Sequence, residues 1–100
     1  MDYKKIFETI LKKCKPLAES FGLDLAESFK KDISDFLRNI ELEKIIVELT
    51  NKEITKAEFE SLLKGKMDLA EMILLKNAGL SLVEINKFKN NLLQIIIETI

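Results

Sequence analysis

The side chains that most often carry out chemistry in proteins are scarce in this sequence. Its 100 residues include no histidine and a single cysteine, Cys14. Without histidine there is no Ser–His or Cys–His nucleophile pair, no imidazole metal ligand and no general base that titrates near neutral pH. One thiol can form neither a zinc cluster nor an intramolecular disulfide. We therefore predict a protein that is not an enzyme, with no cofactor and no small-molecule substrate.

The remaining chemical candidates are carboxylates, and their spacing is typical of solvent-facing helix surfaces. Aspartates and glutamates alternate with apolar residues over 32–48. This pattern predicts the solvated faces of amphipathic helices and no pair of catalytic acids. The acidic residues are Asp32, Asp35, Glu41, Glu43 and Glu48. Cys14 falls on an apolar stripe, so we expect a buried and unreactive thiol. No catalytic residue and no metal ligand is assigned.

Residues 54–62 resemble the second half of an EF-hand calcium loop and its exit helix. In this resemblance Glu58 would be the bidentate calcium ligand. The first and third ligand positions would then fall on Val47 and Leu49, and the turn glycine on Lys52. A calcium ion requires several oxygen ligands. We therefore interpret Glu58 as part of a helix cap.

Residues 69–91 resemble a helix-turn-helix DNA-binding motif in their spacing. The side chains that would face DNA are Asn86, Lys87, Lys89 and Asn90. Leu75, however, stands where the motif usually has a small residue, and residues 81–100 carry two lysines and two glutamates. Because attraction to phosphate supplies much of DNA affinity, a DNA-binding transcriptional regulator is only the alternative function.

A helix-start pattern occurs four times and is the most specific structural signal. Asp24, Thr55, Asp68 and Ser81 each follow an apolar residue and are followed three positions later by glutamate. The short side chain can accept a hydrogen bond from the N–H three residues on, and the glutamate can bond back to the N–H of the cap residue. Glycines at 65 and 79 stand where a left-handed cap would end the preceding helices. The pattern predicts helices that begin after these four residues.

Apolar periodicity predicts an all-α fold, a compact bundle of five or six short helices in a single domain over 1–100. The first helix begins at Tyr3 with Asp2 as its cap, and Pro16 ends or kinks it, with a further turn possible before residue 22. Two apolar stripes, over 29–40 and 42–49, point to opposite sides, so we predict a break near 39–41; a continuous helix buried on both sides is the alternative. Further helices are predicted over 56–64, over 69–78 and from Leu82 nearly to Ile100. The segment 69–78 is apolar almost all round, which predicts a central position in the bundle.

The charge balance gives no general attraction to nucleic acid or to an anionic membrane. The formal net charge is −1, with a sequence pI near 5.6. Residues 1–22 carry five lysines and three acids, and residues 23–50 carry four basic and seven acidic groups, so we expect the first helix to lie beside an acidic second helix. The sequence has no run of about 18 apolar residues that could span a membrane and no apolar region of a signal peptide. We expect a cytoplasmic protein.

The segment 92–100 has apolar side chains over about 200° of the helix surface. Leu92, Ile95 and Ile96 extend the stripe that faces the core, whereas Leu93, Ile97 and Ile100 lie to one side of it. Either the fold covers this helix on two sides, or the second group forms a partner surface; contact with a membrane is least favoured because no cluster of lysines flanks it. We predict a regulatory, inhibitory or assembly protein that binds a protein partner, or itself as a homodimer, through this second group.

Overall fold

The computed structural model describes residues 2–22, 27–70, 75–76 and 79–100. Five helices account for most of these residues: α1 (Tyr3–Ser20), α2 (Glu27–Asn39), α3 (Leu42–Thr50), α4 (Lys56–Leu69) and α6 (Leu82–Thr99). No strand occurs in the described ranges, and the predicted all-α bundle is confirmed. None of the described helices is long and apolar enough to cross a bilayer.

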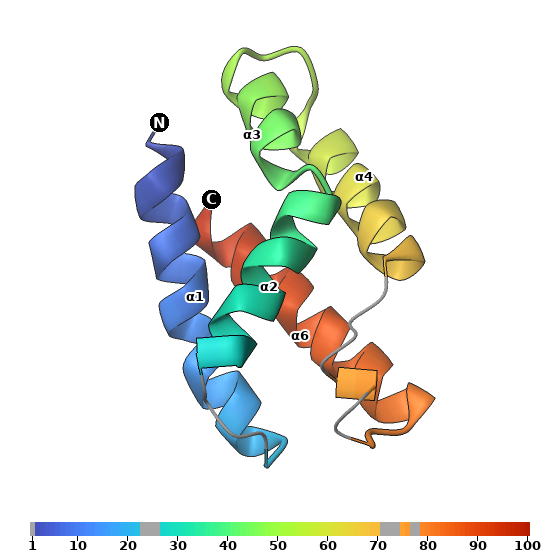
Figure 1. The fold of residues 1–100 in the computed structure, drawn as a ribbon. Coiled ribbons are helices and arrows are strands. Elements are labelled where there is room, and N and C mark those ends of the chain that lie inside the picture. Colours follow the sequence, from blue (N-terminus) through green and yellow to red (C-terminus); the bar gives the residue numbers. More distant parts are fainter. Residues whose placement is uncertain (1, 23–26, 71–74, 77–78) are drawn as a thin grey trace.

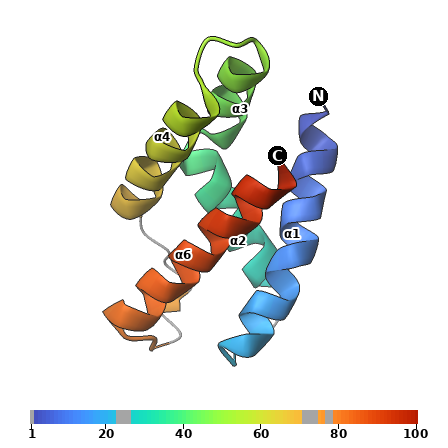
Figure 2. The same ribbon diagram turned by 180° about the vertical axis from the view of Figure 1, so that it is seen from behind.

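The helix α6 lies between α1 and α4. It runs diagonally behind α2 in Figure 1, and the reverse view in Figure 2 shows α1 and α4 on its two sides. Both α1 and α4 pack against α6, while α2 packs against α1 and α3. The radius of gyration is 13.2 Å, the value of a compact domain of this length.

One apolar core joins all five helices. On each helix the buried side chains recur every three or four residues, so that one face of the helix is apolar. The buried set is Ile10, Cys14 and Ala18 from α1; Phe29, Ile33, Phe36 and Leu37 from α2; Leu42, Ile45 and Ile46 from α3; Phe59, Leu63 and Met67 from α4; and Phe88, Leu92 and Ile96 from α6, with Ile40 and Leu75 outside these five helices. No described polar or charged side chain is buried.

The first helix begins as predicted and extends further than Pro16. The Asp2 carboxylate accepts a hydrogen bond from the Lys4 N–H at 3.1 Å. Proline removes one backbone donor, yet α1 continues to Ser20. Ala18 beyond the proline is completely buried, and this burial helps to offset the missing hydrogen bond. The prediction that Pro16 could end the helix is therefore wrong, and the further turn before residue 22 is present.

The predicted break between α2 and α3 is confirmed. Glu41 has a φ of 56°, in the left-handed region, and this residue separates the two helices. The change of direction lets both apolar stripes reach the same core, since Phe36 on α2 and Ile45 on α3 are both buried. A left-handed conformation costs a non-glycine residue roughly 1–2 kcal/mol. The side-chain contacts of Glu41, described below, are therefore relevant to the stability of this break.

The predicted helix starts at Thr55 and Ser81 are confirmed in detail. Each hydroxyl accepts from the N–H of the glutamate three residues on, and each glutamate carboxylate accepts from the N–H of the cap residue, at 3.0–3.2 Å. Glu58 is thus engaged in a helix cap. Gly79 has a φ of 82°, and the N–H of the next residue, Leu80, bonds to the Leu75 carbonyl, which is the predicted left-handed cap. The start at Asp24 lies outside the described residues.

The predicted helix end at Gly65 and the start at Asp68 are wrong, because α4 continues through both to Leu69. Glycine inside a helix costs about 1 kcal/mol relative to alanine, but Met67 beyond it is 2% exposed, and burial of such a side chain outweighs that cost. Asp68 instead pairs with Lys64 one turn back, at 3.9 Å. The predicted central helix over 69–78 lies mostly outside the described residues.

Candidate interaction surfaces

The described residues present no metal-binding cluster. They contain no group of three or more carboxylate or cysteine side chains close enough to hold a metal ion. Cys14 is completely buried in the core, as the sequence predicts, and burial raises the pKa of its thiol to about 12. The thiol is therefore in its protonated, weakly nucleophilic form at neutral pH. The carboxylates from Asp32 to Glu48 are exposed or half-buried.

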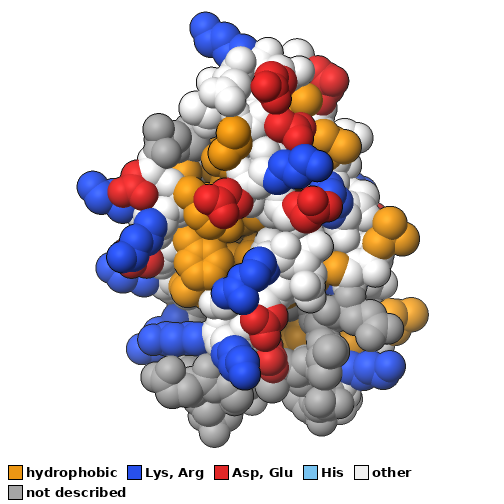
Figure 3. Space-filling model, turned by 45° about the horizontal axis from the view of Figure 1, so that its top comes forward, with side chains coloured by type: hydrophobic (Ala, Val, Ile, Leu, Met, Phe, Trp, Pro, Cys, Tyr) orange, Lys and Arg blue, Asp and Glu red, His pale blue; other side chains and the backbone are white. Residues whose placement is uncertain are grey.

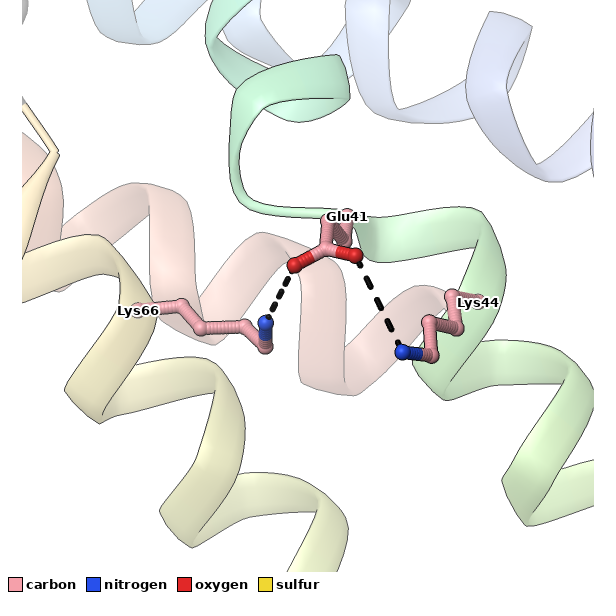
Figure 4. Close-up of polar contacts among 3 residues, drawn as sticks. All are labelled: Glu41, Lys44 and Lys66. Carbon is pink, nitrogen blue, oxygen red and sulfur yellow. Dashed lines mark hydrogen bonds and ion pairs between the residues drawn. The ribbon is translucent and has the colours of Figure 1, made fainter.

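Among the described carboxylates, Glu41 is the one that pairs with two lysines (Figure 4). Its Oε1 accepts a hydrogen bond from Lys66 Nζ at 3.0 Å, and its Oε2 lies 3.9 Å from Lys44 Nζ. The hydrogen bond from Lys66, with the charges of both lysines, holds the pKa of Glu41 below its ordinary value. These contacts join the start of α3 to α4. Their geometry is that of structural ion pairs, in which Glu41 and the two lysines already contact one another.

The predicted partner residues near the chain's end are partly covered by the fold itself. Leu93, Ile97 and Ile100 are each half-buried and pack against the core. Ile97 and Ile100 line a hollow of about 150 Å³ whose other walls come from Leu49 on α3 and from Lys56 and Phe59 on α4. The fold thus covers α6 from the α1 side and partly from the α4 side. Leu93, Ile97 and Ile100 each keep part of their surface exposed to a partner.

The most exposed aliphatic side chains lie elsewhere, at the first turn of α6 and the end of α4. Leu82 is 73% exposed, Val83 is 64% exposed and Leu69 is 89% exposed. Leu69 and Leu82 line one surface hollow of about 380 Å³. The sequence analysis missed this patch. A signal was available, because the direction of Val83 on a helix of 3.6 residues per turn is nearly opposite to that of Leu92 in the core.

The residues of the alternative DNA-binding surface are only partly free. Asn86, Lys87 and Asn90 are exposed on α6. Lys89 is half-buried, and its Nζ donates a hydrogen bond to the backbone carbonyl of Ala70. One of the two lysines that would approach phosphate is therefore already engaged within the protein.

A further surface follows the outer side of α1. Tyr3, Phe7 and Leu11 are spaced four residues apart and are each half-buried against the core. Two successive hollows, of about 420 Å³ and 470 Å³, lie between this stripe and the elements α2 and α3. Figure 3 shows exposed apolar surface on this side of the molecule with charged side chains around it. Burial, and to a lesser extent the charge of Glu43, raises the pKa of Tyr3, while Arg38 opposes them.

Comparisons with known proteins find no match to this chain: no family model, no curated protein and no solved structure resembles it closely enough to be significant. Function is therefore argued from these surfaces alone.

Proposed function

We propose that the protein is a non-enzymatic protein–protein interaction module that associates with itself through α6, in a regulatory, inhibitory or assembly role. The observation that carries the proposal is a set of exposed aliphatic side chains: Leu82 on α6 and Leu69 on α4 line one hollow, and Val83 follows Leu82 in the first turn of α6. Fully burying a large aliphatic side chain gains roughly 1.5–3 kcal/mol. A partner that covers these side chains gains that energy, whereas a monomer forgoes it.

A symmetric dimer is the arrangement that the proposal favours. Two-fold pairing places the same patch of each subunit against the other, so that neither apolar patch stays exposed to solvent. On a helix of 3.6 residues per turn, Leu82, Leu93 and Ile100 share one direction. Two copies of α6 that pair along this direction would bury the exposed first turn and the open edge of the last turns together.

Sedimentation at micromolar concentration tests this proposal. The wild type should sediment as a dimer, and Leu82→Glu combined with Val83→Glu should give a folded monomer. Glutamate is well tolerated in the first turn of a helix because it complements the helix dipole, so the helical circular dichroism should be retained. Val47→Glu, at another exposed aliphatic residue (48% exposed, on α3), is the matched control and should remain a dimer. A wild type that sediments as a monomer over the whole range would refute self-association.

A further inference from the structure

The positive charge of α1 is not neutralised within the described part of the protein. The sequence leads us to expect the basic first helix to lie beside an acidic second one, and α1 does pack against α2. Yet among the described residues no ion pair within 4.0 Å involves a lysine of α1: the four that occur join residues from 35 to 68. Asp35 on α2 pairs with Arg38 of its own helix. Lys13 donates a hydrogen bond to the Thr99 hydroxyl at 3.3 Å, whereas Lys4, Lys12 and Lys15 are exposed and can reach an external acidic group.

The side of α2 that borders the α1 hollows adds further positive charge. The larger hollow is lined by Leu11 and Phe29 at its apolar base and by Lys12, Lys15, Lys30 and Glu8. The second hollow includes Lys4 beside Tyr3 and Phe7. Its two carboxylates are Glu41, which is already bonded to Lys66 and Lys44, and Glu43. What remains around the two hollows is an excess of uncommitted lysines beside a continuous apolar stripe.

The dimensions of this stripe match a helical segment. The stretch from Tyr3 to Lys15 spans about 18 Å at the helical rise per residue. Apolar residues one turn apart, with charged residues beside them, are what an amphipathic helix recognises when it lies in a groove between two helices. Complementary charges at the edge of such a groove fix the partner's position and speed its association.

We propose that the groove between α1 and α2, formed by the stripe Tyr3, Phe7 and Leu11 and bordered by Lys4, Lys12, Lys15 and Lys30, binds an acidic amphipathic helix of a partner protein. The partner's aliphatic or aromatic side chains fill the two hollows, and its glutamates or aspartates face the lysines. This site lies away from the α6 patch proposed for self-association, so the module carries one surface for itself and another for a different partner.

Fluorescence anisotropy with a defined peptide tests the site. The probe is a labelled 16-residue synthetic peptide with leucine and phenylalanine at helical spacing and glutamate at most other positions. A second peptide of identical composition, with the apolar residues redistributed over all faces, is the matched control. The full chain should bind the amphipathic peptide at least about tenfold more tightly than the redistributed one. Affinity should fall several-fold on raising NaCl from roughly 50 to 300 mM, because exposed charges are screened.

Charge-reversal variants locate the binding. Lys12→Glu with Lys15→Glu changes only exposed side chains and should weaken binding about tenfold or more. Lys52→Glu with Lys87→Glu makes the same change in net charge at exposed residues outside α1 and should leave affinity within about twofold of wild type. The Leu82→Glu, Val83→Glu variant should still bind the peptide, which separates this site from the self-association proposal.

The proposal is overturned by any of three results. Equal affinity for the two peptides would show that the protein does not recognise an apolar face of the peptide helix. Equal weakening by the two lysine pairs would show that only total charge matters. Tighter binding to single-stranded DNA of similar charge than to the peptide, lost in the Lys12→Glu, Lys15→Glu variant, would identify a nucleic-acid surface instead.

Discussion

Lys66 on α4 donates a hydrogen bond to Glu41, the left-handed residue between α2 and α3, with 3.0 Å between Nζ and Oε1. The two residues are 25 positions apart in the sequence. Among the described junctions between consecutive helices, the one between α2 and α3 is the only one with a non-glycine left-handed residue directly before a helix start. The contact joins this junction to α4, which packs beside α3.

Replacing Lys66 by methionine should lower the thermal midpoint by roughly 1–3 °C near neutral pH, because an exposed ion pair is lost while the aliphatic stem is kept. The pKa of Glu41 is lowered in the folded state, so the stabilisation is present above the ordinary carboxyl pKa and is lost as the pH falls through the folded-state pKa. The difference between variant and wild type should therefore disappear in strong acid. Thermal melts at several pH values measure it.

Lys5→Met is the control for this experiment, since Lys5 is exposed on α1 and forms no ion pair with a described residue. It should melt like the wild type at every pH. A Lys66→Met deficit that persists unchanged in acid would mean that the lysine acts through packing and not through Glu41.

Cys14 should react with a soluble aromatic disulfide reagent only after denaturant is added. The side chain has no solvent exposure and its pKa is about 12, so both access and thiolate formation are opposed in the native state. In Ser61→Cys, at an exposed position on α4, the new thiol should react within seconds while Cys14 remains protected. Rapid reaction of wild type in native buffer would contradict the assignment of Cys14 to the core.

The two ends of α6 should respond differently to glutamate substitution. Leu82→Glu with Val83→Glu should abolish the dimer and change the unfolding free energy of the monomer by less than about 1 kcal/mol, since both side chains are largely exposed. Leu93→Glu with Ile97→Glu should also give a monomer but lose about 1–3 kcal/mol, because these residues are half-buried against the core. Sedimentation combined with urea unfolding distinguishes the cases.

Failure of the Leu93→Glu, Ile97→Glu variant to fold at all, with the first-turn variant still dimeric, would assign these residues wholly to the core. It would also remove α6 as the self-association surface.

Host genomic or random duplex DNA should not be shifted at moderate salt. The residues of α6 carry two lysines and two glutamates, and Lys89 is bonded to Ala70, so few phosphates can be neutralised. Gel shifts over a range of NaCl concentrations measure this. A complex that weakens steeply with salt and is lost in Lys87→Glu would favour the DNA-binding alternative.

Local signals made much of the fold predictable. The capping boxes at Thr55 and Ser81 depend on residues three positions apart, so sequence alone contains the whole interaction. The break near Glu41 was also predictable, although no glycine or proline marks it, because two apolar stripes with opposite directions cannot both reach one core from a straight helix.

The errors arose where tertiary contacts outweigh local preference. Asp68 satisfies the cap pattern, yet it lies inside a helix because Met67 before it is buried. Pro16 and Gly65 disfavour helix by amounts that burial of a neighbouring side chain can offset. The candidate surfaces were harder to predict still. Whether a flank of α6 is covered depends on where α4 lies, and the sequence does not state the direction in which α4 packs.

The packing of α1 against α6 has a consequence for how the chain acquires its structure. During synthesis α1 emerges before the other described helices, and the helix against which it packs emerges after them. Closing a loop that long costs more entropy than forming local contacts, and contacts between distant residues slow folding. Until α6 is complete, the apolar stripe around Ile10 lacks the larger part of its cover, with only α2 to pack against it, and a nascent chain paused at that stage would offer chaperones a basic, amphipathic helix.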